Sequence, residues 1–243
     1  MAVKRSHSGS RVLAVMEAIA SHQPIGVRAL ARLLDQDKSA IQRAVMTLAD
    51  GGWIRPTREP PVRWEVTARI VTVANAALGS SDLRRRARPL LEQVRDDTGE
   101  TVLLVVPDLQ NFVIADVVES RQVLRMVPQL GILVGTRNTA TGRAVLPYMD
   151  TARQMALLGA EPDGPLLDSF EATRKHGYAV SDGEINPAAT NIAAPIFELA
   201  GFPAGAIVVT APRERLTPAD HQAIGKMLIR VASELSRGTP RSS

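Results

Sequence analysis

The feature that most constrains the fold is a series of three short helical patterns in residues 12–48. In each pattern apolar side chains recur every three or four residues, which is typical of an amphipathic helix. The first pattern ends at Pro24, and the second, shorter pattern covers residues 27–34. The third covers residues 41–48 and ends at Gly51-Gly52. The sequence therefore predicts a compact unit of three short helices.

Two short strands are expected after the third helix, at residues 53–54 and 64–66. A basic, turn-rich stretch (residues 55–63) separates them, and Pro60-Pro61 keeps the strands from lengthening into a larger sheet. Three helices followed by a basic two-stranded hairpin have the layout of a winged helix-turn-helix. We therefore expect residues 1–78 to form a DNA-binding domain of this type.

The positive charge is concentrated in the same segment. Residues 1–78 contain 11 Lys and Arg against 6 Asp and Glu, a net charge of +5, whereas the remainder contains 18 against 19, a net charge of −1. Such an asymmetry is typical of a nucleic-acid-binding segment attached to a body that does not bind nucleic acid. A solvated cationic face without any partner is the alternative interpretation.

The third helix is expected to read DNA with the face that it does not bury. Arg and Gln side chains can contact guanine and adenine in bidentate fashion, whereas Lys38 and Ser39 near the helix start are suited to phosphates. Arginines on the second helix and on the wing would add contacts to the backbone or the minor groove. The alternative is an ordinary three-helix fragment whose polar face is exposed to solvent and binds no DNA. The residues expected to contact DNA are Arg28, Lys38, Ser39, Gln42, Arg43, Thr47, Arg55, Arg58 and Arg63.

Composition excludes several classes of site. The 243 residues, 45% of them hydrophobic, are enough for a buried core. The absence of cysteine excludes disulfides, thiolate zinc sites and cysteine nucleophiles, and the four histidines show no metal-ligand spacing. No apolar run is long enough to span a bilayer, and no export signal is present. We expect a soluble cytoplasmic protein without a metal, a cofactor or a membrane partner.

Beyond residue 78 the pattern changes to a mixture of helices and strands. Gly79-Ser80-Ser81 is the expected domain boundary, after a helix over residues 70–78. Residues 79–98 are expected to form a linker helix that kinks or restarts at Pro89. In the domain of residues 99–243, strands are expected at 101–106, 112–118, 123–127, 178–181, 191–197 and 204–210, and helices at 143–149, 151–158, 166–176 and after Thr217-Pro218.

Several segments together resemble the IclR-type bacterial transcriptional regulators. These are KSAIQRAV from Lys38, LADGGWI from Leu48, TATGRAVL from Thr139, HGYAVSD from His176, NIAAPIF from Asn191 and RLTP from Arg215. They occur in that family's order and approximate spacing, and the resemblance covers nearly the whole chain. It implies an α+β protein of two domains, in which a linker helix joins a winged helix-turn-helix to a GAF-like α/β domain that binds an effector. It also implies dimers, often paired into tetramers.

The resemblance further implies a pocket for a small organic or aromatic acid. Backbone N–H groups near residues 141–143 could receive its carboxylate. Asn191 stands where a cysteine is common in the family, and Val208 and Ser181 replace the Ser and Asp of members that sense very small acids. A less polar pocket favours a larger or more apolar effector, although each residue could instead have a purely structural role. The positions implied are Ala140, Thr141, Ser181, Asp182, Asn191, Val208 and Thr210.

The sequence leaves three functions open. The first is a ligand-responsive regulator, a repressor that binds a pseudo-palindromic operator in double-stranded DNA as a homodimer or homotetramer. The second is a constitutive DNA binder whose C-terminal domain only dimerises. The third is a small-molecule enzyme, which is disfavoured because the sequence has no GxSxG elbow, phosphate loop or dinucleotide fingerprint. We expect no catalytic residues.

Overall fold

The computed structural model describes residues 6–73 and 82–237 of the chain. The chain divides into two compact units, Met1–Ser80 and Ser81–Ser243. The expected boundary at Gly79-Ser80-Ser81 lies outside the described residues, as do residues 74–78 of the expected helix 70–78. Residues 69–73 form the beginning of that helix.

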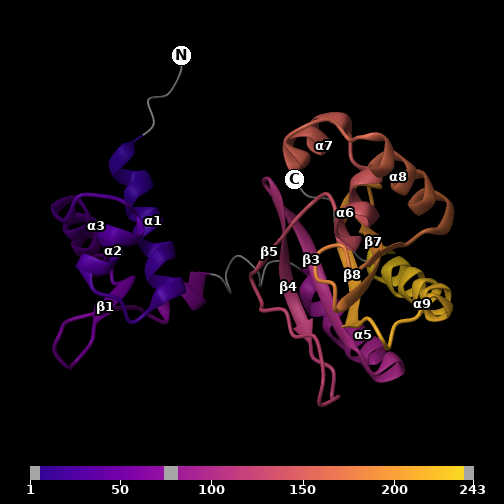
Figure 1. The fold of residues 1–243 in the computed structure, drawn as a ribbon, viewed down its shortest axis with the longest axis horizontal. Coiled ribbons are helices and arrows are strands. Elements are labelled where there is room, and N and C mark those ends of the chain that lie inside the picture. The colour runs from indigo at the N-terminus through magenta and orange to yellow at the C-terminus, as the bar shows by residue number, and fades with distance from the viewer. Residues whose placement is uncertain (1–5, 74–81, 238–243) are drawn as a thin grey trace. The chain divides into compact units, whose positions relative to one another are not determined.

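The N-terminal unit packs three helices beside a two-stranded antiparallel hairpin (Figure 1). Its elements are α1 (His7–His22), α2 (Val27–Leu33), α3 (Lys38–Asp50), β1 (Ile54–Pro56) and β2 (Trp64–Val66). Ile25 and Trp64 form an antiparallel bridge that ties the hairpin to the helices. The predicted helices and hairpin are confirmed, and their apolar positions make the core, in which Val15, Ile19, Leu30, Ile41 and Val45 are fully buried.

The C-terminal unit is built on a six-stranded sheet in the order β5-β4-β3-β8-β7-β6, in which every neighbouring pair is antiparallel. The strands are β3 (Thr101–Asp108), β4 (Asn111–Val118), β5 (Leu133–Val134), β6 (Ala179–Asp182), β7 (Ala189–Phe197) and β8 (Pro203–Pro212). The helices are α5 (Asp82–Thr98), α6 (Ala140–Val145), the 3-10 turn η1 (Leu146–Tyr148), α7 (Thr151–Leu158), α8 (Gly164–His176) and α9 (Pro218–Arg237).

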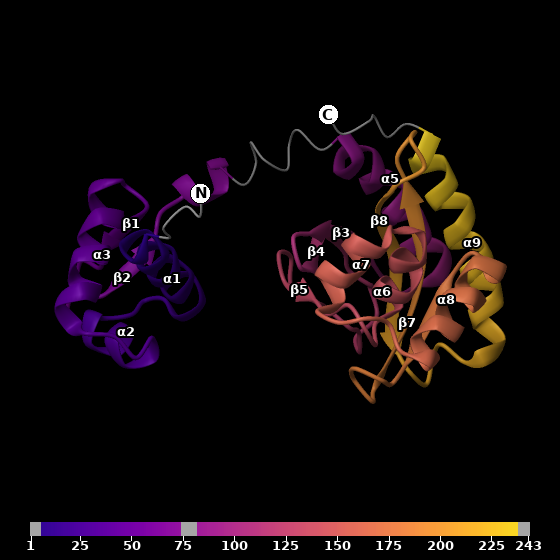
Figure 2. The same cartoon turned by 90° about the horizontal axis from the view of Figure 1, so that it is seen from above.

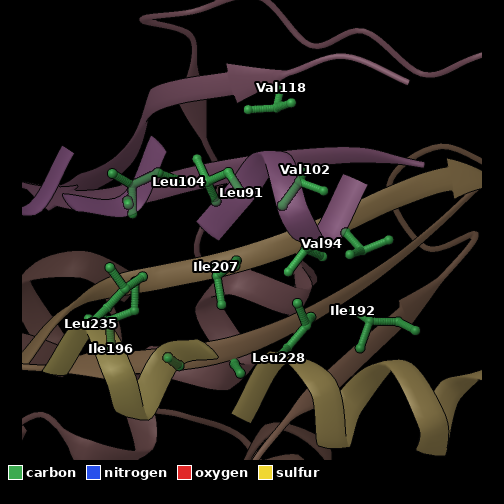
Figure 3. Close-up of a cluster of buried hydrophobic side chains, with 14 of the residues drawn as sticks. Leu91, Val94, Val102, Leu104, Val118, Ile192, Ile196, Ile207, Leu228 and Leu235 are labelled. Atoms are coloured by element: carbon green, nitrogen blue, oxygen red, sulfur yellow. The ribbon is translucent and has the colours of Figure 1, made fainter. Parts of the chain in front are cut away.

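One face of the sheet packs against α5 and α9. Successive strand residues point to opposite faces, so Leu104, Ile192 and Ile207 meet these two helices. Helix α9 begins where Thr217 hydrogen-bonds the Asp220 carboxylate, and it buries Leu228 completely. Figure 3 shows this core between the sheet and the two helices, with Leu91, Val94, Val102, Leu104, Val118, Ile192, Ile196, Ile207, Leu228 and Leu235 labelled.

The opposite face packs against α6, η1, α7 and α8 (Figure 2). Its core includes Leu103, Phe112, Leu146, Phe170 and Val208. Among the described residues, Phe112 and Phe170 are the largest side chains that are fully buried. A sheet with helices on both faces has two cores, and the α6 side is the one that contains the cavity described below.

The expected strand at residues 123–127 is wrong. The connection between β4 and β5 is an irregular loop, and the strand β5 forms later, at Leu133–Val134 (Figure 1). Val123 is 98% exposed, so the apolar run that predicted a strand has no sheet face to pack against. The carbonyl of Leu124 accepts a hydrogen bond from Arg215 Nη1 at 2.9 Å. The backbone acceptor of Leu124 is thus satisfied by a side chain from a distant part of the sequence.

Two helix predictions are also corrected. Helix α5 runs through Pro89 as one element, so it does not restart there. The helix expected at residues 143–149 begins three residues earlier, at Ala140, and changes to the 3-10 turn at Leu146. The early start follows from Thr139, whose side chain accepts a hydrogen bond from the Gly142 N–H and so caps α6.

Candidate functional site

Helix α3 exposes a polar face to solvent and buries its apolar face. Asp37 caps its N-terminus by accepting hydrogen bonds from the N–H groups of Ser39 (2.8 Å) and Ala40 (3.2 Å). Ser39 donates its hydroxyl to the same carboxylate, and this hydrogen bond is the largest cause that lowers the Asp37 pKa. The hydroxyl of Thr47 likewise donates to the Arg43 carbonyl at 3.0 Å. Two of the expected DNA contacts therefore have local partners, whereas Lys38, Gln42 and Arg43 carry exposed side chains.

The wing is a short hairpin closed by Thr57. The Thr57 N–H donates to the Arg63 carbonyl (2.8 Å), and the Arg63 N–H donates to the Thr57 hydroxyl (3.0 Å). Arg55 forms an ion pair with Glu65 across the hairpin at 3.5 Å, so its charge is partly compensated. Arg58 and Arg63 have no ion-pair partner among the residues that the structure describes. All nine residues expected to contact DNA are exposed in this unit.

A cavity of about 280 Å³ lies in the C-terminal unit between the sheet and the start of α6. Ser181, Asn191 and Thr210 form a row across its floor, because they are register partners on β6, β7 and β8. Val208 lies two residues before Thr210 on the same face of β8. Six of the seven residues expected around an effector line this cavity, namely Ala140, Thr141, Ser181, Asn191, Val208 and Thr210.

Asp182 is the exception, and its expected place in the pocket is corrected. It follows Ser181 directly on β6, so its side chain points to the other face of the sheet. There it accepts a hydrogen bond from the Thr190 hydroxyl (2.7 Å) and forms an ion pair with Arg213 (2.9 Å). The Thr190 hydroxyl and then Arg213 lower the pKa of Asp182. These contacts give this carboxylate a structural role.

The polar groups of the cavity differ in what they can still bind. The Ser181 hydroxyl donates to the Asn138 carbonyl at 3.0 Å. The side chains of Thr141, Asn191 and Thr210 have no hydrogen-bond partner among the described residues. Thr141 and Thr210 are nevertheless almost completely buried. Their hydroxyl groups are therefore open to a partner inside the cavity.

The start of α6 has fewer free backbone N–H groups than the sequence suggests. Thr139 takes up the N–H groups of Gly142 (3.0 Å, to Oγ1) and Arg143 (3.1 Å, to the carbonyl). The N–H groups of Ala140 and Thr141 have no acceptor within the described residues. Of the N–H groups expected at residues 141–143, only that of Thr141 is therefore available to a ligand, together with its neighbour Ala140.

Sequence reasoning missed the apolar wall of the cavity. This wall comes from β3, β4 and the connection between β4 and β5, and the mistaken strand at 123–127 concealed its role. Of the described residues that line the cavity, none carries a charge. The apolar lining residues include Leu103, Ile114, Met126, Pro128, Ile132 and Val134.

Two negative findings concern other kinds of site. In residues 6–73 and 82–237, no three His, Cys, Asp or Glu side chains gather as a metal site would require. Over the same residues, no helix is both long and apolar enough to cross a membrane.

The sequence matches two known family models. The model for "Bacterial transcriptional regulator IclR C-terminal" matches residues 75–237, and a family model called HVO_A0114 matches residues 10–67. The HTH-type transcriptional regulator BhcR of Paracoccus denitrificans is 28% identical over 239 residues, which cover 94% of this chain and 85% of the relative. The transcriptional repressor IclR of Escherichia coli is 27% identical, with 93% and 88% covered.

A solved structure shows the same fold. The IclR transcriptional regulator of Alicyclobacillus acidocaldarius superposes with a TM-score of 0.81 at 19% identity, covering 96% of this chain and 99% of that one. The expected architecture of a winged helix-turn-helix followed by an α/β domain is confirmed by this likeness. The matched relatives regulate transcription and are not enzymes. Since the matching family model spans most of the sequence, the chain belongs to the IclR family of bacterial transcriptional regulators.

Proposed function

We propose that this regulator binds an operator in double-stranded DNA through α3 and the wing, and that a small organic or aromatic acid in the cavity changes this binding. The observation that carries the proposal is the cavity itself, which is lined by the hydroxyl groups of Thr141 and Thr210, and neither group has a hydrogen-bond partner among the described residues. A hydroxyl group both donates and accepts, so a ligand with polar atoms can form hydrogen bonds with these two groups.

The lining favours an effector with a mostly apolar body. A cavity of about 150 Å³ is known to hold benzene, so one of about 280 Å³ has room for a single ring with a short substituent. A carboxylate on that ring would find the N–H groups of Ala140 and Thr141 and the free hydroxyls at one end. The uncharged wall of Leu103, Ile114 and Met126 would cover the ring.

We propose a dimer as the DNA-binding form, because one helix-turn-helix reads only a half-site and two-fold proteins match pseudo-palindromic operators. Repression is the proposed sign of regulation, and it is supported by relatives named as repressors, such as the acetate operon repressor of Salmonella typhimurium. The effector would act by binding one arrangement of the DNA-reading units better than another.

A thermal-shift titration of the full chain tests the ligand. Small carboxylic, hydroxy and aromatic acids are compared, and the binding class is expected to stabilise the protein by about 2.7 kcal/mol at 100 times its Kd. In Val208→Phe the new ring fills the cavity, and the shift should disappear. Leu109→Phe adds the same ring at a position that is 90% exposed, so it should keep the shift.

The outcomes separate the two regulator hypotheses. A shift that Val208→Phe abolishes, followed by an altered affinity for DNA when the same acid is added, supports a ligand-responsive regulator. A shift that persists in Val208→Phe places the ligand elsewhere and contradicts the proposed cavity. DNA binding without a shift from any acid supports the constitutive binder.

A further inference from the structure

A second hollow lies in the N-terminal unit, and its lining is strongly basic. This groove of about 720 Å³ runs between α2, the end of the wing and α3. Arg28 and Arg32 line it from α2, Arg63 lines it from the wing, and Gln42 lines it from α3. No acidic residue belongs to the lining. The groove is therefore a concave surface of one charge sign.

The three guanidinium groups are free to bind. Among the described residues, Arg28, Arg32 and Arg63 have no ion-pair partner and no side-chain hydrogen bond. Arg28 and Arg32 lie one turn apart on α2, a spacing at which two like charges destabilise a helix. A bound anion would remove this repulsion. The arrangement is thus suited to a polyanion that spans several arginines.

The backbone fixes the two sides of the groove relative to each other. Ile25 and Trp64 exchange hydrogen bonds, with N–H to carbonyl distances of 3.2 and 2.9 Å. This bridge holds the residue before Trp64, which is Arg63, beside the start of α2. The arginines therefore face the groove from elements that do not separate easily, and little order has to be created on binding.

The position of Gln42 indicates the kind of anion. Gln42 belongs both to the exposed face of α3 and to the groove, so the two surfaces are continuous. A DNA strand lying along α3 would continue into the groove, where its phosphates meet three arginines. A small anion would not use a surface of this extent.

We propose that this groove binds the sugar-phosphate backbone of DNA, and that Arg32 is a phosphate contact in addition to Arg28 and Arg63. This inference rests on the proposed function as a DNA-binding regulator. Arg32 lies on the same helix, α2, as Arg28, and it is not among the DNA contacts expected from the sequence. Its contact is independent of base sequence, since a phosphate is the same at every step.

The salt dependence of binding to a random duplex of about 30 bp tests the proposal without knowledge of the operator. Each phosphate contact contributes about 0.9 to the slope of log affinity against log salt. In the full chain, Arg32→Ala should reduce the magnitude of this slope by about 0.9 for each N-terminal unit that is bound to DNA. When the salt concentration rises from 50 to 200 mM, the affinity of the variant for DNA should therefore fall less than that of the wild type. The difference should be about 3.5-fold for each N-terminal unit that is bound to DNA. Arg32→Lys should restore the slope, since lysine also neutralises a phosphate.

Arg230→Ala is the matched control, because Arg230 is exposed on α9 and lacks a partner within the described chain. It removes the same charge and should leave the slope unchanged. Arg28→Ala provides a second groove variant in case Arg32→Ala is poorly folded, and it should lower the slope likewise. Slopes for both groove variants equal to that of Arg230→Ala would overturn the inference while DNA binding stands. A wild type that does not bind the duplex even at low salt would overturn the proposed function itself.

Discussion

Arg215 and Glu100 form a two-pronged ion pair that links the start of α9 to the start of β3. The Nε–Oε1 distance is 2.6 Å and the Nη2–Oε2 distance is 2.8 Å, and Glu100 is 5% exposed. The third donor, Nη1, holds the carbonyl of Leu124 in the connection that carries Met126 to the cavity wall. Bidentate pairs of this kind fix geometry as well as charge. Arg215 therefore positions one wall of the cavity from a distant part of the sequence.

Removal of this arginine should be costly. Arg215→Ala leaves the Glu100 carboxylate buried without a counter-charge, and breaking such a pair costs about 3 kcal/mol of unfolding free energy. Urea unfolding measures the loss. Arg215→Lys keeps the charge but not the fork, so it should retain part of the stability. A variant Arg215→Ala as stable as the wild type would show that the pair contributes nothing measurable.

Gly142 in α6 tolerates no side chain. A Cβ atom at this position would lie 1.7 Å from the carbonyl oxygen of Thr136, which is backbone and cannot rotate away. Gly142→Ala should therefore destabilise the protein by about 1–3 kcal/mol and displace the start of α6. Gly164→Ala is the control, because a Cβ there meets nothing within 4 Å. The melting temperatures of Gly142→Ala and Gly164→Ala test this prediction. Equal values for the two variants would contradict the close contact at Gly142.

The ion pair of Asp182 with Arg213 should make the folding stability of the protein depend on pH. Its pKa is lowered from the ordinary value of 3.8 by the Thr190 hydroxyl first and by Arg213 next. A group with a lowered folded pKa contributes stability above its unfolded pKa and loses it as the pH falls through the folded pKa. Asp182→Asn should thus be less stable than the wild type at neutral pH, and the difference should shrink below pH 3.8. Urea midpoints across this range test it, and a difference independent of pH would contradict the assignment.

Arg43 on α3 should contribute to sequence preference. Its side chain is exposed, and a guanidinium group can make two hydrogen bonds to guanine. Loss of such a contact costs about 1–3 kcal/mol of discrimination against the wrong base. Once an operator is selected from a random pool, Arg43→Ala should lose affinity for it while binding random DNA almost as before. Equal weakening on both DNAs would instead assign Arg43 to the phosphate backbone.

Much of the fold follows from local pattern. The apolar spacing in α1, α3 and α9 is reproduced in the buried faces of these helices, and Thr217 with Asp220 marks where α9 begins. The row of Ser181, Asn191 and Thr210 was expected as part of one pocket through the family resemblance, and cross-strand register brings these residues together. The position of Asp182 was not predictable from the expected strand at 178–181, because β6 extends one residue further and so turns this side chain to the opposite face of the sheet from Ser181.

By itself, the sequence determined what short-range forces decide: approximately where the helices and most of the strands lie, which faces they bury, and that the positive charge belongs to the N-terminal unit. Only the tertiary structure shows that residues 123–127 form a loop, in which Val123 is 98% exposed and the Leu124 carbonyl accepts a hydrogen bond from Arg215, 91 residues further along the chain. It also decided that Arg28, Arg32 and Arg63 share one groove, since the bridge between Ile25 and Trp64 joins segments that are distant in sequence. Contacts of this kind depend on which surfaces meet in the folded chain, and local propensity carries no information about them.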